Sequence, residues 1–173
     1  TASAMKLPPH ACHADWESPL GTLTLAATDA GLCGAWFAGQ KHWPDLARAR
    51  ALASVSEHPL LARAAAQLAE YFAGQRRVFD LPLDLSGGTA FEQSVWRALG
   101  GIGAGGTASY GGIAASLGRP SAARAVGAAV GRNPLSVIVP CHRVLGAGGA
   151  LTGYAGGLPR KVALLRAEGV AVA

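Results

Sequence analysis

Short segments with a helical spacing of apolar residues, each followed by glycine, dominate the second half of the 173-residue chain. Apolar residues that recur every three or four positions predict an amphipathic helix, and glycine ends a helix because it adopts the left-handed backbone conformation without steric cost. The pattern predicts four helices, over 91–99, 110–117, 121–130 and 158–168. Only residues 118–121 separate the second helix from the third, which predicts a helix-turn-helix with Ser121 as N-cap.

Two other segments of this half lack a helical period. Residues 137–139 are apolar and β-branched, which predicts a short buried strand. The glycine-rich stretch 146–149 predicts a loop in the position of a wing. With the helix-turn-helix, these segments predict a winged-helix-like domain.

The first half has the sequence pattern of a small α/β domain. Segments 21–26 and 31–37 predict a β-hairpin, residues 60–72 predict a helix that ends at Gly74, and alternation over 78–85 predicts another strand. We therefore expect an α/β fold with two domains, 5–85 and 86–173, joined through a linker at 86–89. Residues 1–4, ahead of Met5, are interpreted as a cloning remnant.

Composition excludes several classes of protein. Half of the residues are hydrophobic and 14% are charged, which predicts a folded chain, and no apolar run reaches the length of a membrane span. Three cysteines are too few for a disulfide scaffold, and an odd number leaves at least one thiol free. We expect a cytoplasmic protein that does not associate with membranes.

Positive charge is concentrated in the second half of the chain. Residues 1–85 contain seven Lys and Arg against eight Asp and Glu, whereas residues 86–173 contain eight against two. The formal net charge of +5 therefore arises from the second half. A basic surface either keeps a protein soluble or binds a polyanion such as nucleic acid, and charge alone leaves both interpretations open.

The helix predicted over 121–130 is rich in alanine, with only Ser121 and Arg124 as polar residues. Small side chains let a helix approach another surface closely. The helix therefore either packs against a neighbouring helix or enters a nucleic-acid groove without reading the sequence. In the second case, Arg124 is the one side chain that can enter a base stack or replace a lost base partner.

Cys141 follows Pro140 directly after the strand predicted over 137–139, and His142 and Arg143 come next. A reactive thiolate needs a nearby base and positive charge, so this order is typical of an activated cysteine. Adjacent strand residues point in different directions, so we expect His142 to reach the sulfur through a bent backbone or a water.

The other residues that could take part in this chemistry have less specific sequence patterns. Glu168, in a half of the chain with few carboxylates, either orients His142 or is a solvated residue at a helix end. Cys12 and Cys33 have the pattern of ordinary small buried residues.

These motifs together resemble the O6-alkylguanine-DNA alkyltransferases over residues 91–169. The sequence PCHRV at 140–144 matches their active-site signature, AARAVG at 122–127 matches their recognition helix, and GYAGG at 153–157 matches the loop before their last helix. The first half is similar only through SPLG at 18–21 and YFAG at 71–74.

The resemblance implies a ribonuclease H-like N-terminal domain and a reaction that needs no cofactor. A thiolate displaces guanine from its alkyl group in double-stranded DNA containing O6-alkylguanine, and a thioether remains on a monomeric, single-use protein. The implied catalytic residues are Cys141 as alkyl acceptor, His142 as base through a water, Glu168 as its orienting partner, Asn133 as the residue that shapes the turn, and Tyr110 as donor to the departing guanine.

The resemblance also implies a DNA surface and a substrate pocket. Arg124 fills the space of the flipped nucleotide, and the other implied DNA-binding residues are Ser121, Ala122, Ala123 and Arg119. The implied pocket residues are Val139, whose carbonyl faces the base, Pro140, Tyr154 and Ala155.

The sequence departs from the family pattern at two places. Residues 103–106 are Gly-Ala-Gly-Gly where relatives have a proline and a polar residue, which predicts a more mobile loop. Some relatives bind zinc in the first domain, but here Cys33 occupies one ligand position and Thr28 another. His10, Cys12 and His13 do not have a recognised zinc spacing, so we predict no functional metal.

Three other classes of protein remain as alternatives. A winged-helix regulator with a redox-sensing cysteine would need more base-reading side chains than Ser121 and Arg124. A non-catalytic relative that only recognises lesions would not need Cys141 within the full signature. A thiol peptidase would need a separate His and Asn in a substrate groove.

Overall fold

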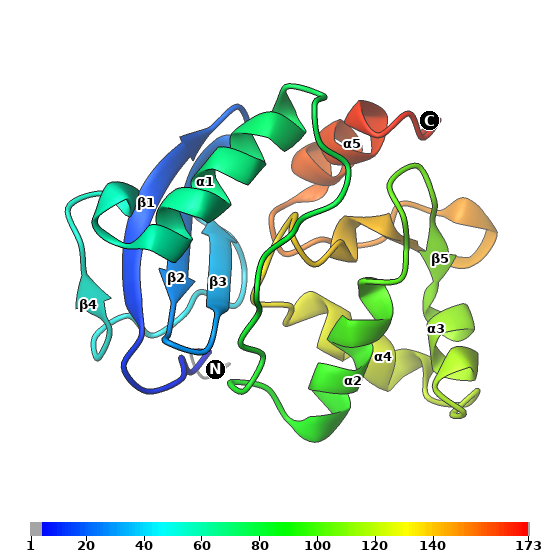
Figure 1. The fold of residues 1–173 in the computed structure, drawn as a ribbon. Coiled ribbons are helices and arrows are strands. Elements are labelled where there is room, and N and C mark those ends of the chain that lie inside the picture. Colours follow the sequence, from blue (N-terminus) through cyan, green and yellow to red (C-terminus); the bar gives the residue numbers. More distant parts are fainter. Residues whose placement is uncertain (1–4, 173) are drawn as a thin grey trace. The chain divides into compact units, whose positions relative to one another are not determined.

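The computed structural model describes residues 5–172, which divide between Gly87 and Gly88 into two compact units (Figure 1). Residues 1–4, interpreted above as a cloning remnant, lie outside the described residues. No helix in the described part of the chain has the length and apolar character needed to cross a membrane.

The first unit is built on a four-stranded sheet with the order β3-β2-β1-β4. Its strands are β1 (Cys12–Ser18), β2 (Gly21–Ala27), β3 (Leu32–Phe37) and β4 (Arg50–Ala51). The first three are antiparallel neighbours, and β4 runs parallel to β1. The hairpin predicted from residues 21–37 is therefore confirmed, whereas the sequence analysis did not identify β1.

Helix α1 (Pro59–Phe72) packs on this sheet, after a single 3-10 turn, η1 (Val55–Glu57) (Figure 1). Proline is favoured in a first helical turn because that turn has no need of its N–H. Buried Leu61 and Leu68 face the sheet core, and the helix ends before Gly74, whose φ is +77°. This is the predicted helix with its predicted end.

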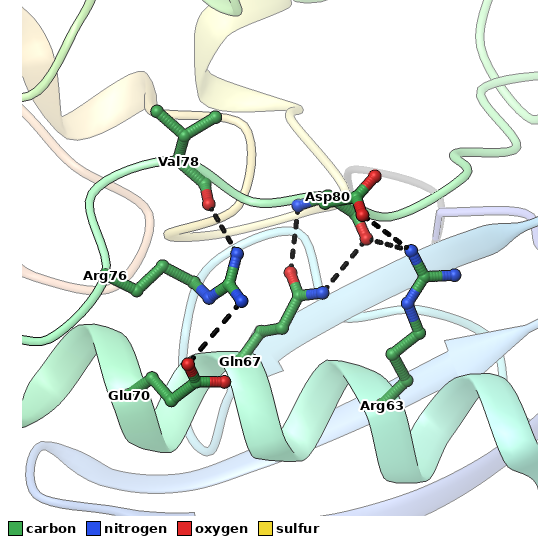
Figure 2. A network of polar contacts seen from close by, with 6 residues as sticks. All are labelled: Arg63, Gln67, Glu70, Arg76, Val78 and Asp80. Atoms are coloured by element: carbon green, nitrogen blue, oxygen red, sulfur yellow. Dashed lines mark hydrogen bonds and ion pairs between the residues drawn. The ribbon is translucent and has the colours of Figure 1, made fainter.

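The strand predicted over 78–85 is wrong. This segment is extended but forms a single parallel bridge, between Leu83 and Leu32 at the end of β3. Side chains of α1 hold it instead: the Gln67 amide donates to the Asp80 carbonyl at 3.0 Å and accepts from the Asp80 N–H at 2.9 Å (Figure 2). The segment is therefore held by Gln67 of α1 at Asp80 and by two backbone hydrogen bonds to Leu32 of β3, without forming a regular strand.

The second unit consists mainly of short helices. They are α2 (Ala90–Leu99), α3 (Tyr110–Ser116), α4 (Ala123–Gly131) and α5 (Leu158–Ala167), which confirms the four predicted helices. A capping box of Thr89 and Glu92 begins α2. The Trp96 indole on α2 donates to the Ala129 carbonyl at 2.8 Å, which fixes α2 against α4.

Helices α3 and α4 pack against each other as the expected helix-turn-helix, but their joint spans residues 117–122. The N-cap of α4 is Ala122, without a side-chain hydrogen bond, so the prediction of Ser121 as the N-cap is wrong. Ser121 instead belongs to the preceding turn, where the Ala122 N–H donates to the Arg119 carbonyl at 2.9 Å.

One predicted β feature of this unit is also wrong. Residues 137–139 form consecutive turns rather than a strand. The loop expected as a wing is a short 3-10 turn, η3 (Ala147–Gly149), closed by the Gly146 N–H donating to the Ala150 carbonyl at 2.8 Å. It follows β6 (Val144–Leu145), which pairs in parallel with β5 (Ala108–Ser109).

Candidate active site

A buried turn between α4 and Cys141 is organised by the Asn133 side chain. Its amide donates to the Val139 carbonyl at 2.8 Å and to the Leu135 carbonyl at 3.4 Å, and its oxygen accepts from the Leu135 N–H at 3.0 Å. A buried backbone group needs such a partner because water cannot reach it. The Asn133 side chain therefore provides hydrogen bonds to Leu135 and Val139 that a neighbouring strand would otherwise provide.

The same turn contains two three-residue reversals. Val137 has a φ of +72°, which is uncommon for a β-branched residue, and the Ile138 N–H donates to the Ser136 carbonyl across it at 2.9 Å. Pro140 supports the second reversal, in which the Cys141 N–H donates to the Val139 carbonyl at 2.8 Å. Cys141 then begins the 3-10 turn η2 (Cys141–Arg143).

The Val139 carbonyl accepts from both Asn133 and the Cys141 N–H. A backbone carbonyl has two lone pairs, so both are used within the turn. Both donors come from within the turn, and Val139 and Pro140 are buried. That the Val139 carbonyl faces a base stays a prediction.

The Cys141 thiol is buried. Burial raises its pKa above the usual value of 9.0, because a thiolate loses hydration there, while Asn133, Lys161 and Tyr154 act in the opposite direction. The resting group is therefore a thiol, surrounded by side chains that stabilise the thiolate once a base removes the proton.

His142 and Glu168 form a buried pair, with 2.8 Å between His142 Nε2 and a Glu168 carboxylate oxygen. Burial lowers the pKa of His142 below 6.5, and the carboxylate raises it to a smaller extent. The imidazole is therefore neutral at pH 7, with Nε2–H donating to Glu168. Its Nδ1 is buried and has no hydrogen-bond partner among the described residues.

Arg143 differs from the expectation that its charge acts on the thiol. Its guanidinium binds both Glu168 oxygens, with two contacts of 2.8 Å, and also donates to the Ile102 carbonyl. Such a bidentate pair keeps the carboxylate ionised and fixed in orientation. Glu168 is therefore a buried residue of the site, and the alternative of a solvated helix-end residue is excluded.

The two tyrosines of the predicted site come from different elements. Tyr110 begins α3, and its hydroxyl lies 3.0 Å from the Thr152 hydroxyl. Tyr154 and Ala155 are half-buried in the loop before α5, and Tyr154 contributes a hydrogen bond that favours the Cys141 thiolate. The loop thus places Thr152 against Tyr110 and Tyr154 against Cys141.

The predicted DNA-binding residues lie around the start of α4. Arg124 and Ser121 are exposed, whereas Ala122 and Ala123 are half-buried. Arg119 is also exposed, and its guanidinium lies 5.5 Å from the centre of the Phe91 ring. The face of α4 opposite Arg124 packs into the domain through Val126 and Val130. One face of the helix is therefore buried, while Arg124 on the other face is exposed.

The cysteines of the first unit are buried. Cys12 donates to the Ala27 carbonyl, and burial and nearby Asp84 raise the pKa of Cys33 to about 12. The Thr28 hydroxyl donates to Asp84 at 2.5 Å. Within residues 5–172, no group of three His, Cys, Asp or Glu side chains is placed to hold a metal ion.

Family models describe both units of the chain. The model of the 6-O-methylguanine DNA methyltransferase ribonuclease-like domain matches residues 13–85, and that of the DNA binding domain matches residues 90–170. The methylated-DNA--protein-cysteine methyltransferase of Mycolicibacterium paratuberculosis is 48% identical over 153 residues, 88% of each chain. The chain belongs to the 6-O-methylguanine DNA methyltransferase family. Within that family, the protein from Salmonella typhimurium is 58% identical over 60% of each chain.

Solved structures of 6-O-methylguanine DNA methyltransferases agree with this assignment. The Mycobacterium tuberculosis OGT, crystallised in complex with DNA, has a TM-score of 0.82 and 46% identity, and the match covers 90% of this chain and 91% of that one. The enzyme from Pyrococcus kodakaraensis shares the fold at a TM-score of 0.56 and 23% identity.

Sequence reasoning missed Lys161 in this member of the methyltransferase family. Lys161 is fully buried on α5, and its ammonium donates to the Val144 carbonyl at 2.7 Å and to the Thr152 carbonyl at 3.1 Å. Burial lowers its pKa, and Cys141 acts in the opposite direction. The helical period could have identified it, because Lys161 lies on the same buried face of the helix as Leu164, Leu165 and Glu168.

Proposed function

We propose that this chain repairs O6-alkylguanine in double-stranded DNA by transferring the alkyl group to its own Cys141. The observation that supports the proposal most directly is the arrangement around that thiol, with a neutral His142 held by Glu168 and a buried ammonium at Lys161. We assign DNA binding and catalysis to residues 86–173 and a separate domain to residues 5–85. We further propose that the protein is a cytoplasmic monomer.

The proposed reaction begins with removal of the thiol proton. His142 Nδ1 is the available basic atom, because Nε2–H donates to Glu168. A water between Nδ1 and the sulfur carries the proton to the imidazole, since a buried polar atom of this kind commonly binds water. Lys161 then stabilises the thiolate by its positive charge.

The thiolate sulfur next attacks the alkyl carbon. The new S–C bond forms as the bond between that carbon and guanine O6 breaks, and the electron pair leaves with the guanine. Tyr110 donates a hydrogen bond or a proton to the departing base. The product is a thioether, which has no good leaving group, so each chain acts once.

Intact-mass measurement tests this proposal. After incubation with a duplex containing O6-methylguanine, we expect the chain to gain the mass of one CH2 group, because methyl replaces the thiol hydrogen. The gain should stop at one equivalent per chain with excess lesion. Cys141→Ser should abolish it, and Cys12→Ser and Cys33→Ser should leave it unchanged.

Two results would overturn the proposal. Transfer that survives Cys141→Ser would move the nucleophile elsewhere, and repeated turnover would exclude a stable thioether. A chain that binds the lesion without any gain in mass would be the non-catalytic relative.

A further inference from the structure

Thr152 contacts two different groups of the proposed site. Its hydroxyl lies 3.0 Å from the Tyr110 hydroxyl, and its backbone carbonyl accepts from the Lys161 ammonium at 3.1 Å. Tyr110 is the proposed donor to the departing guanine, and the charge of Lys161 favours the Cys141 thiolate. Thr152 thus contacts both the proposed donor to the leaving group and the cation that favours the thiolate. Nothing in its sequence context identified it as a site residue.

The backbone around Thr152 is built to hold it in one place. Its N–H donates to the Ala150 carbonyl at 3.1 Å, and the same carbonyl accepts from Gly146 at 2.8 Å. A Cβ added at Gly146 would lie only 2.6 Å from the Thr152 Cγ2 methyl, so the loop needs glycine at that position. The Thr152 methyl therefore packs closely against Gly146 of the short loop in the wing position.

The Tyr110 hydroxyl has limited ways to point its proton at a substrate. A phenol has one proton, and if that proton is donated to Thr152 it is not available to guanine. When Thr152 donates instead, its hydroxyl proton satisfies the phenolic oxygen and leaves the phenolic proton free. The same hydrogen bond strengthens if the phenol transfers its proton, because the oxygen then carries negative charge.

We propose that Thr152 is a positioning residue for alkyl transfer, whose hydroxyl donates to Tyr110 and thereby directs the phenolic proton to the departing guanine. This inference rests on the proposed function. In the transfer step the S–C bond forms, the C–O6 bond breaks, and the electron pair on guanine is stabilised or protonated by Tyr110. A phenolate formed in this way is held by the Thr152 hydrogen bond until solvent returns the proton.

The principal test compares Thr152→Val with Thr152→Ser. Valine removes the hydroxyl and keeps the backbone carbonyl that binds Lys161, whereas serine keeps both. We expect Thr152→Val to slow transfer from methylated duplex DNA about fivefold, the effect of one ordinary hydrogen bond, and Thr152→Ser to restore a rate close to the original. Thr22→Val is the matched control, since it removes a threonine hydroxyl bound to Glu17 in the first unit and should leave transfer unchanged.

A double-mutant cycle with Tyr110→Phe distinguishes positioning from general damage. If Thr152 acts through the phenol, Thr152→Val should change the rate less than twofold in the Tyr110→Phe background. Alkylation of Cys141 by iodoacetamide supplies a second readout, because iodide leaves without a proton. That rate should be equal in the original chain and in Thr152→Val.

Several outcomes would overturn the inference. They are full activity of Thr152→Val, an equal loss in both Tyr110 backgrounds, a parallel loss with iodoacetamide, or a Thr152→Ser chain as slow as Thr152→Val. If the original chain itself takes no alkyl group from DNA, the proposed function fails and this inference fails with it. If the original chain is active and only the Thr152 comparison fails, the proposed function stands.

Discussion

Arg124 is the only long polar side chain on α4, and it is exposed. A guanine in a duplex must leave the base stack before its alkyl group can reach a buried thiol, at a cost of a few kcal/mol. If Arg124 fills the vacated space, Arg124→Ala should slow transfer from duplex DNA by at least about tenfold, which corresponds to 1.4 kcal/mol. Reaction with free O6-benzylguanine needs no flipping and should keep its rate.

Arg119→Ala is the matched control for that measurement, because Arg119 is another exposed arginine of the same unit. We expect it to weaken DNA binding modestly and to leave the ratio of the two second-order rates unchanged. Equal loss on duplex and free base in Arg124→Ala would instead assign Arg124 to the structure of the pocket.

The pH dependence of transfer should report His142. Its folded-state pKa lies below 6.5, so the neutral base is present at pH 7 and is lost as pH falls through that lowered value. The thiol, whose pKa is raised by burial, does not ionise by itself near neutrality. We therefore expect a constant rate between about pH 7 and 8 and a decline below about 6.5.

Free O6-benzylguanine is the substrate for this pH measurement, since it removes any effect of pH on DNA binding. A rate that rises in proportion to hydroxide from pH 6 to 9 would contradict the role of His142. That result would show that ionisation of Cys141 itself limits the reaction.

At the scale of elements, the contact between α1 and residues 76–85 depends on Gln67. Its amide satisfies both the N–H and the carbonyl of Asp80, and the Gln67 side chain is buried (Figure 2). Gln67→Ala removes two hydrogen bonds and should lower the free energy of unfolding by about 2 kcal/mol. The shift in the urea midpoint measures this loss.

Arg63 supplies the comparison, because it also binds Asp80, through an exposed ion pair of 3.1 Å and an exposed hydrogen bond to the Asp80 carbonyl. Exposed pairs contribute about 1 kcal/mol or less, so Arg63→Ala should have the smaller effect. Equal effects of the two substitutions would show that the Gln67 amide does not anchor the segment.

Helices were the elements best predicted from the sequence. Glycines correctly predicted where helices end, because Gly74, Gly118 and Gly169 adopt positive φ in the structure. Strands were predicted less well. Residues 78–85 and 137–139 have the residue types of strands, but the side chains of Gln67 and Asn133 provide part of their hydrogen bonding. Sequence periodicity contains no information about such side-chain partners.

The proposed site was predictable in its residues but not in their pairing. Cys141, His142 and Glu168 follow from the motif and the helix period, and the structure brings the last two within 2.8 Å. That Arg143 pairs with Glu168, while the charge of Lys161 favours the Cys141 thiolate, depends on how α5 packs against η2. Contacts between residues so distant in sequence are set by tertiary packing.

For the whole molecule, the distribution of charge predicts how DNA binding responds to salt. Two cations of the second unit, Arg143 and Lys161, are buried, and Arg132 pairs with Glu92 at 3.1 Å. The remaining cations are Arg97, Arg119, Arg124, Arg160 and Arg166, which are exposed or half-buried. If all five contact phosphates, the plot of log affinity against log salt should have a slope no steeper than about −4.5, at about −0.9 per contact.

Binding titrations on duplexes of unrelated sequence at several salt concentrations measure this slope. Arg166→Ala should reduce its magnitude by about one unit if Arg166 meets a phosphate. A strong preference for one duplex sequence would contradict this expectation and would favour the regulator considered above.

The bridge between Leu32 and Leu83 also bears on how copies of this protein behave in a crowded solution. Strand β3 is at the edge of its sheet, where unpaired backbone groups can recruit a strand from another molecule. Residues 82–84 occupy the start of that edge, with the Leu32 N–H donating to the Pro82 carbonyl at 2.8 Å and its carbonyl accepting from Asp84 at 2.8 Å. Gly31 permits this approach, because a Cβ there would lie 2.8 Å from the Pro82 carbonyl oxygen. The segment that follows α1 thus pairs the first residue of this edge strand and shortens the edge that is open to a strand from another molecule.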